Sequence, residues 1–561
     1  MASFKIASAF KSAVDNISAL ESIIMQSFGP NGLDTALKTE TGSIIVTNCG
    51  RTILSSISLS HPVGRMILGQ VQSHAEITGD NSKTFIMVLS ELLRNLYEGV
   101  LINSKIQNIS PELARLSNAC ASLCGALNKE APISLKTIYN NFNHDPSDFN
   151  QRIKGLITTT LNGKFPPRII SLLAEQLLEI VLRNCSCTTN FLEHIQHLIA
   201  DFPDICVQVH GLGTENSAVK DGFLLKQEPT GRLEPGFLAN PINFLCINDG
   251  FDLEKLESSK LCFSLDQFKT NTYIEIRSGV IKRFANKLQE NGIKLILCSS
   301  GLPDYVHFIL KSKLCIIQHV GDEEIKRICC YLGIMPLENF NDVFQDDISI
   351  HRGTFTGAER VVIGTERYFS VTPANNCKSD RPCCYLILCA PSSGICQQYF
   401  KAIFNALKVL RMAFWSKYGD YQCRSDSLAY VPGAGASEIA IGTYFDDIAL
   451  NTEDQDQQIV ARSLSQALLS VPRNLHRCSN SQHKLFIDTI TTIKDKYKAQ
   501  QTNNATFYGI NGRSGGVFEP LKDDVIEPYS SKILLIDHVL QAAQQILRID
   551  FIVPSKCIKL Q

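Results

Sequence analysis

The sequence predicts an α+β multidomain protein in which a helical domain, formed by both ends of the chain, is interrupted by an α/β insert. Apolar residues recur at helical spacing near the N-terminus and again after Pro391. Between about residues 205 and 335, short apolar strands alternate with single helices. The chain of 561 residues is long enough for about three or four such domains.

The N-terminal part is expected to form long helices around a small hairpin. An apolar stripe between Phe10 and Ile24 predicts an amphipathic helix that stops at Gly29-Pro30. Residues 37–46 carry a turn between two extended runs and predict the hairpin, after which helix resumes. A second stripe, residues 85–96, predicts a helix that begins directly after a small polar loop.

The middle of the chain is expected to form a sheet covered by helices. Its expected strands are residues 223–225, 244–247, 295–297, 314–317 and 383–390. The expected helix at residues 280–291 carries an apolar side made of Val280, Ile281, Phe284 and Leu288. That side either packs into the core or offers a surface to a partner. After Pro391, apolar residues between Ile403 and Phe414 predict the return of helix.

Composition and charge exclude several classes of protein. The chain has 54 Lys and Arg against 55 Asp and Glu, so no global field attracts nucleic acid or an anionic membrane. A hydrophobic fraction of 44% excludes wholesale disorder. We expect no signal peptide and no membrane span, because no run of ~18 uncharged apolar residues occurs. The 20 cysteines, without a Cys-x-x-Cys pair, are expected to be reduced thiols in the cytosol.

Two glycine-rich loops stand before expected helices. The first is Gly79-Asp80-Asn81-Ser82-Lys83-Thr84, and the second, within residues 431–438, contains Gly433-Ala434-Gly435. The first is not a P-loop, because that motif needs a glycine directly before its lysine. Backbone N–H groups at a helix N-terminus can cradle phosphate oxygens, and Asp80 is placed to hold Mg²⁺. Taken singly, the first loop is better explained as a helix cap, and the second is also explained as a close packing corner.

A series of short segments in a fixed order adds to these loops. They are residues 28–34 (FGPNGLD), 46–54 (VTNCGRTIL), 61–62 (HP), 79–84 (GDNSKT), 159–164 (TTLNGK), 431–438 (VPGAGASE), 471–473 (VPR), 525–528 (VIEP) and 546–550 (ILRID). In order and spacing they resemble motifs of the group II chaperonins, the family of the eukaryotic cytosolic ring chaperonin CCT. The resemblance covers nearly the whole chain.

The resemblance implies the fold of a group II chaperonin subunit, with a helical equatorial domain, an intermediate hinge domain and an α/β apical domain. The expected segments are 1–140 (equatorial), 141–204 (intermediate), 205–350 (apical), 351–394 (intermediate) and 395–561 (equatorial). It also implies a site for ATP or ADP with Mg²⁺ at Asp80. The residues implied for nucleotide binding are Gly29, Pro30, Asn48, Gly79, Asp80, Asn81, Ser82, Lys83, Thr84, Gly433, Ala434, Gly435 and Glu527.

The chain departs from the family where the family hydrolyses ATP. The first expected catalytic carboxylate is replaced by Cys49, and alignment of the helix before residue 431 puts Lys401 at the second. A thiol and an ammonium group cannot act as the general base at neutral pH. Lys83 stands where the family's phosphate loop has a threonine. The alternative for Lys401 is a solvated helix face shared with Asn405 and Lys408, which still leaves the carboxylate absent.

Such loss of catalytic residues resembles the chaperonin-like proteins tied to Bardet-Biedl syndrome. Residues 61–67, 78–86, 388–391 and 406–411 carry this finer resemblance. It implies an assembly factor without ATP hydrolysis and with at most weak nucleotide binding. Such a factor works with CCT subunits and other chaperonin-like proteins on BBSome subunits, in the cytoplasm and at the centrosome or ciliary basal body. The alternatives are a diverged ATP-hydrolysing subunit of a CCT-type ring and a centrosomal or basal-body scaffold.

Overall fold

The computed structural model divides the chain into two compact units. It describes residues 2–38, 42, 44–103, 109–129, 146–184, 191–231, 241–248, 270–338, 343, 347–374, 384–415, 428–479, 485–499 and 506–549. One unit contains both chain ends (Met1–Leu178, Thr188–Leu192 and Lys401–Gln561), and the other contains Glu179–Cys187 and Glu193–Phe400. The expected fold class, a helical domain from both ends with an α/β insert, is confirmed.

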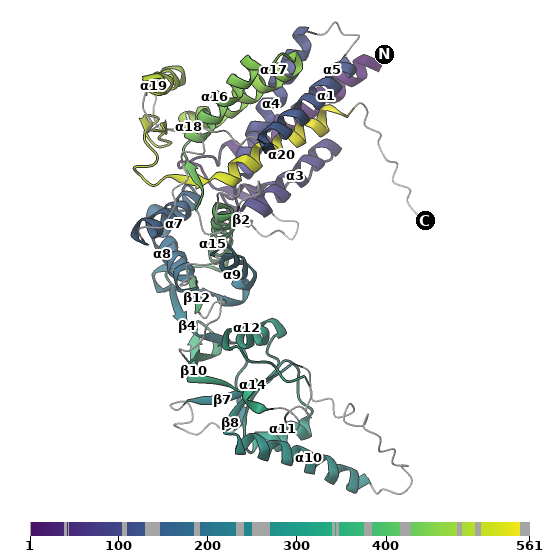
Figure 1. Ribbon diagram of the computed structural model, residues 1–561, viewed down its shortest axis with the longest axis vertical. Helices are drawn as coiled ribbons and strands as arrows, with labels where there is room; N and C mark the ends of the chain where they lie inside the picture. Colours follow the sequence, from purple (N-terminus) through teal and green to yellow (C-terminus); the bar gives the residue numbers. More distant parts are fainter. Residues whose placement is uncertain are drawn as a thin grey trace. The chain divides into compact units, whose positions relative to one another are not determined.

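The first unit is a bundle of helices with short strands at one end (Figure 1). Its helices are α1 (Ala2–Met25), α2 (Gly50–Ser55), α3 (Pro62–Thr78), α4 (Ser82–Asn103), α5 (Ile109–Lys129), α7 (Pro146–Leu161), α16 (Ala436–Asn451), α17 (Gln455–Leu468), α18 (Ser470–Arg477), α19 (Phe486–Ala499) and α20 (Tyr529–Leu547). Its strands are β1 (Thr35–Lys38), β2 (Ile44–Thr47), β13 (Tyr430–Pro432), β14 (Gly509–Ile510), β15 (Val517–Phe518) and β16 (Ile526–Pro528).

Apolar stripes hold this bundle together. The stripe of α1 expected from the sequence is buried, from Phe10 to Ile24, and its helix ends ahead of Gly29. In α4 the side chains of residues 85–90 are completely buried, so the helix is covered on all sides near its N-terminus. Figure 1 shows α1, α4, α5 and α20 side by side. The buried N-terminal turn of α4 is therefore a rigid support for the loop that precedes it.

Three helices continue from one unit into the other. They are α8 (Pro167–Asn184), α9 (Phe191–Ile205) and α15 (Ser393–Phe414). The second unit contains α10 (Thr270–Glu290), α11 (Asp304–Lys311), α12 (Asp322–Leu332), α14 (Ile348–His351), and the strands β3 (Cys206–His210), β4 (Ala218–Asp221), β5 (Phe223–Leu225), β6 (Thr230–Gly231), β7 (Ile242–Ile247), β8 (Ile293–Cys298), β9 (Cys315–Ile317), β10 (Gly353–Ile363), β11 (Glu366–Pro373) and β12 (Cys384–Ala390).

A seven-stranded sheet in the order β5-β11-β10-β7-β8-β9-β6 forms the centre of the second unit. Its strands β7, β8 and β9 are parallel, and β10 and β11 form an antiparallel hairpin. Alternate residues of β7 enter different cores: Leu245 packs with α10 and α11, whereas Phe244 packs with α12. A smaller sheet pairs β12 with β3 and β4.

The expected strands and helices of the middle segment are present. The apolar side of α10 packs into the core and does not form a surface for a partner. Ile281, Phe284 and Leu288 are completely buried, so these side chains offer no surface to a partner. The sequence missed the β10–β11 hairpin. Because β10 pairs with β7, the large sheet continues past the expected boundary at residue 350. The five-segment division stays a prediction, and its boundary at residues 140–141 lies outside the described residues, as does Cys383.

None of the helices in the described ranges is long and apolar enough to cross a membrane.

Candidate nucleotide site

A cavity of about 470 Å³ lies in the first unit, where loops from distant parts of the chain meet. Its wall includes most of the residues implied for nucleotide binding: Gly29, Pro30, Asn48, Asp80, Asn81, Lys83, Thr84, Ala434, Gly435 and Glu527. Gly79, Ser82 and Gly433 do not line it but adjoin residues that do. The structure therefore brings together segments that are up to about 500 residues apart in the chain.

The loop before α4 is shaped by close backbone contacts. Gly79 ends α3 in the left-handed conformation, and a Cβ atom on it would lie 2.4 Å from the carbonyl oxygen of Asn405 in α15. Asn81 also has a positive φ, and its carbonyl accepts the hydrogen bond of Phe85 N–H in the first turn of α4. Glycine is needed at position 79 because α15 leaves no room for a side chain.

Lys83 extends from the first turn of α4 into the wall of the cavity. Its stem passes Gly50, where a Cβ atom would lie 2.6 Å from Lys83 Cγ. Its ammonium group donates to the carbonyl oxygen of Ser27 and to Asn48 Oδ1. The amide nitrogen of Asn48 donates in turn to the carbonyl oxygens of Gly32 and Leu33, so Asn48 is held on both sides.

Burial lowers the pKa of Lys83 to about 8, and the positive charge of Lys164 adds to this effect. The opposing influence of Asp80 is smaller. The lysine is therefore a mostly protonated cation at neutral pH, held by neutral oxygens.

Asp80, the expected Mg²⁺ ligand, forms an ion pair with Lys164. Asp80 Oδ2 lies 3.2 Å from Lys164 Nζ, and both residues line the cavity. Among the described residues, no group of three His, Cys, Asp or Glu side chains is placed to hold a metal ion. Two ammonium groups thus accompany one carboxylate at the phosphate loop, and their positive charges oppose the binding of Mg²⁺ at Asp80.

A buried cluster of charges forms another part of the cavity wall. Lys532 Nζ, at the start of α20, pairs with Glu438 of α16 and lies 2.6 Å from Glu527 Oε2 of β16. Burial raises the pKa of Glu527, in opposition to Lys532. The turn at Gly433 lies beside this cluster, since a Cβ atom there would be 3.0 Å from Glu527 Oε1. Glu527 is accordingly at the cavity as expected, with its charge balanced by a lysine.

The structure corrects the expectation for Lys401. Lys401 is exposed and does not line the cavity, and the α15 residues packed against Gly79 are Asn405, Lys408 and Val409. Asn405 and Lys408 are also not on a solvated face with Lys401, because the missing side chain of Gly79 lets α15 approach closely and buries both. Cys49 stands between the lining residues Asn48 and Gly50, and it is partly exposed without lining the cavity.

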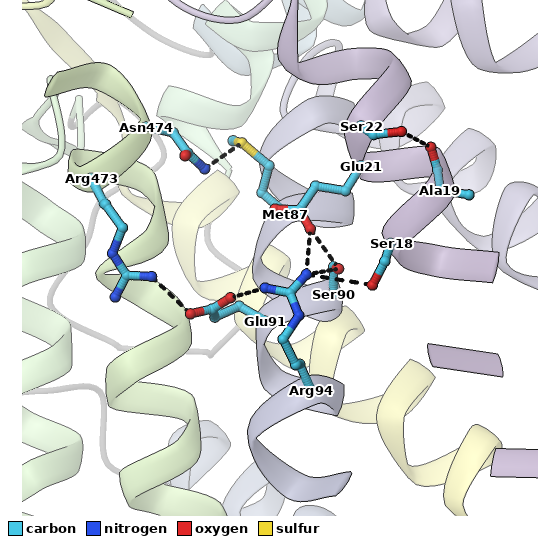
Figure 2. Close-up of polar contacts among 10 residues, drawn as sticks. All are labelled: Ser18, Ala19, Glu21, Ser22, Met87, Ser90, Glu91, Arg94, Arg473 and Asn474. Carbon is cyan, nitrogen blue, oxygen red and sulfur yellow. Dashed lines mark hydrogen bonds and ion pairs between the residues drawn. The ribbon is translucent and has the colours of Figure 1, made fainter. Parts of the chain in front are cut away.

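Three elements around the cavity are joined by an ion network, shown in Figure 2. Arg94 of α4 pairs with Glu21 of α1 at 3.0 Å and with Glu91 at 2.6 Å, and Glu91 pairs with Arg473 of α18 at 2.8 Å. Ser90 Oγ donates to Glu21 Oε2. A second cavity of about 630 Å³ lies beside this network. The network ties α1 and α18 to α4, which carries Lys83.

Sequence reasoning missed three residues that set the charge of the cavity: Lys164, Glu438 and Lys532. Lys164 and Glu438 lie within segments that carried the family resemblance, but no role was assigned to them. Lys532 had one signal, a lone charge at the start of the apolar run of α20. Such a lysine in a buried helix needs an acidic partner.

Comparison with known proteins gives consistent matches over nearly the whole chain. The model of the TCP-1/cpn60 chaperonin family matches residues 20–557. A thermosome subunit of Methanocaldococcus jannaschii is 24% identical over 538 residues, which cover 96% of this chain and 90% of the relative. The T-complex protein 1 subunit gamma of Thalassiosira weissflogii is 23% identical over 556 residues, 95% of this chain and 93% of the relative. A thermosome subunit alpha of Halobacterium salinarum is 22% identical over 544 residues, 96% of this chain and 87% of the relative.

Proposed function

Because the chain belongs to the TCP-1/cpn60 chaperonin family, we propose that it is a chaperonin-like assembly factor that binds nucleotide without hydrolysing it. The nucleotide lies in the cavity between the loops at Gly29, Asp80 and Gly435. The cavity volume is within the range of ordinary small-ligand sites, ~300–1,000 Å³. Backbone N–H groups at the start of α4 are suited to phosphate oxygens.

We infer the absence of hydrolysis mainly from the ion pairs made by the acidic groups that line the cavity. Asp80 is paired with Lys164, and Glu438 and Glu527 share Lys532. The remaining lining carboxylate, Asp523, is exposed. Hydrolysis needs a water molecule held in line and a base that accepts its proton.

Two positions beside the phosphate loop supply no such base. Cys49 is a thiol, and Asn405, whose backbone carbonyl packs against Gly79, carries an amide instead of a carboxylate. An amide nitrogen or oxygen does not accept a proton at neutral pH. The α15 residue beside the loop is therefore Asn405 and not Lys401, and neither residue supplies a base.

For the cellular role, we infer from the finer sequence resemblance that the chain is one of the chaperonin-like proteins tied to Bardet-Biedl syndrome. Among them, it most resembles the Bardet-Biedl syndrome 10 protein. The protein then assists assembly of the BBSome and formation of cilia together with CCT. It works in the cytoplasm and at the centrosome or basal body. The segments that support this are residues 61–67 and 78–86, including the sequence Lys83-Thr84-Phe85.

Affinity capture of the full-length tagged protein from ciliated cells tests the cellular role. Co-purification of CCT subunits with BBSome subunits is the expected result. A stoichiometric eight-member ring without BBSome subunits contradicts it in favour of a diverged folding subunit. Centrosomal proteins alone contradict it in favour of a scaffold. A tagged CCT subunit captured in parallel is the control, because it returns the ring without enrichment of BBSome subunits.

A further inference from the structure

The side chain of Lys83 is held in place as part of the cavity wall. Gly50 leaves room for its stem, since a Cβ atom there would lie 2.6 Å from Lys83 Cγ and 3.3 Å from Cε. The ammonium group is held by two neutral oxygens, the Ser27 carbonyl and Asn48 Oδ1. A lysine has three N–H donors. Two are used by these oxygens, which leaves the third for a ligand in the cavity.

A second ammonium group, that of Lys164, lines the same cavity and pairs with Asp80 at 3.2 Å. Lys164 is close enough for its positive charge to lower the pKa of Lys83. Lys83, Lys164 and Asp80 together carry two positive charges and one negative charge. Beside the loop that precedes α4, the lining of the cavity therefore carries two ammonium groups for one carboxylate.

Mg²⁺ does not fit this arrangement. The ion needs carboxylate and phosphate oxygens in near-octahedral geometry. To reach Asp80 it would have to displace Lys164, and its double charge would then stand beside two ammonium groups. Position 49, where a second carboxylate would assist, holds a cysteine.

Phosphate groups do fit it. An ammonium group binds phosphate as a point charge, and its hydrogen bonds to ionised oxygens are among the stronger ones in proteins. The N-terminus of α4 adds backbone donors and the positive end of a helix dipole. The positive charge of the ammonium groups offsets the negative charge of the phosphates, as a bound metal ion otherwise would.

We propose that Lys83, with Lys164, takes the place of the metal, so that the cavity binds the phosphates of a nucleotide independently of Mg²⁺. This inference rests on the proposed nucleotide binding. It assigns to Lys83 the neutralisation of phosphate charge, which a threonine at this position cannot perform.

Isothermal titration of the purified full-length protein with ADP, in excess Mg²⁺ and in EDTA, tests the proposal. The two dissociation constants are expected to agree within about threefold, a difference of less than 1 kcal/mol. For Lys83→Thr we expect binding in EDTA to weaken about tenfold or more, as for loss of a charged hydrogen bond. Mg²⁺ should restore part of that loss. Lys401→Thr, at an exposed lysine outside the cavity, is the matched control and should leave both constants unchanged.

Wild-type binding that weakens more than about threefold in EDTA overturns the inference and leaves the proposed nucleotide binding standing. Absence of binding in both buffers overturns nucleotide binding itself. Metal-independent binding that persists unchanged in Lys83→Thr overturns the role of Lys83. Thermal unfolding without nucleotide shows whether Lys83→Thr folds. If it does not, Lys83→Gln replaces it, because glutamine keeps the stem and a donor but not the charge. The same changes in the dissociation constants then support or overturn the role of Lys83.

Discussion

Lys532 forms ion pairs with two acidic side chains in the interior of the first unit. The exposed fraction of its side chain is 4%, and that of Glu438 is 2%. Burial lowers the pKa of Lys532, but the charges of Glu438 and Glu527 outweigh burial and raise it. Without this cation two carboxylates would remain together in a region of low polarity, which is costly.

We therefore expect Lys532→Met to destabilise the first unit by ~3–5 kcal/mol, the usual cost of removing one partner from a buried ion pair. Urea unfolding followed by fluorescence measures it, because the single tryptophan, Trp415, belongs to this unit. Lys522→Met is the control: Lys522 pairs with Glu519 at 2.7 Å, but its side chain is 75% exposed. Its loss should have a much smaller effect, because solvent screens an exposed pair. Equal effects of the two changes would contradict a special role for Lys532.

His74 gives the first unit a pH-dependent stability. Burial, assisted by the neighbouring His538, lowers the pKa of His74 to about 3, against a smaller opposite effect of Asp80. The unfolded chain binds a proton at this residue below pH ~6.5, whereas the folded chain does not. Stability should fall by up to ~1.4 kcal/mol per pH unit as the pH decreases from about 6.5 toward 3.

The measurement compares the urea midpoints of wild type and His74→Gln between pH 7 and pH 5. The variant should lose less stability on acidification, because glutamine takes up no proton. His197→Gln, at an exposed histidine, should keep the wild-type slope. A wild-type slope in His74→Gln would show that another group controls this pH range.

At the scale of elements, the contact between the phosphate loop and α15 depends on one glycine. Gly79→Ala places a Cβ atom 2.4 Å from the Asn405 carbonyl oxygen and forces alanine into the left-handed region. We expect a loss of at least ~2 kcal/mol in unfolding free energy from these two effects. Gly125→Ala in α5 has open space around the new Cβ atom and should stabilise by ~0.5–1 kcal/mol. A neutral Gly79→Ala would mean that α15 does not pack against the loop.

Elements with a strong apolar pattern could be predicted from the sequence, and the others could not. The stripes of α1, α4 and α15 and the strands β7, β8 and β9 have buried sides that repeat at the period of the element. The β10–β11 hairpin was missed because its buried residues, among them Phe355 and Phe369, do not recur at a regular period of two, and Val362 is 69% exposed. A strand without regular alternation gives only a weak sequence signal.

The turns and loops of the site could be predicted from the sequence, but its ion pairs could not. Glycines at sharp turns and the loop before α4 follow from local sequence and resemblance. The pairs Asp80–Lys164 and Glu527–Lys532 depend on how separate segments approach one another. The placement of Lys401 failed for a related reason, since an alignment shift within α15 changes the face of the helix to which a residue belongs.

At the scale of the whole molecule, we expect no closed ring made of this chain alone. A ring needs a self-complementary head-to-tail surface on each subunit, and ATP-driven cycling of it needs a catalytic site. Light scattering of the purified protein should give a mass near 62.2 kDa or that of a small oligomer. A mass near eight or sixteen times that value would contradict the proposal of an assembly factor that depends on other chaperonin subunits.

The central claim is that a TCP-1/cpn60 family member has kept a nucleotide cavity and lost hydrolysis. Loss of a positioned general base usually lowers a rate by ~10²–10⁴-fold. Cys49→Asp with Asn405→Asp tests whether carboxylates at the positions beside the loop suffice to restore activity. Cys49→Asp with Lys401→Asp is its matched control, because Lys401 is exposed whereas Asn405 is buried against the loop at Gly79.

The most direct measurement is ATP turnover by the purified full-length protein, freed of any co-purifying chaperonin. We expect a wild-type rate indistinguishable from background, with any gain confined to the variant that carries Asn405→Asp. Clear wild-type turnover that Asp80→Ala abolishes would contradict it.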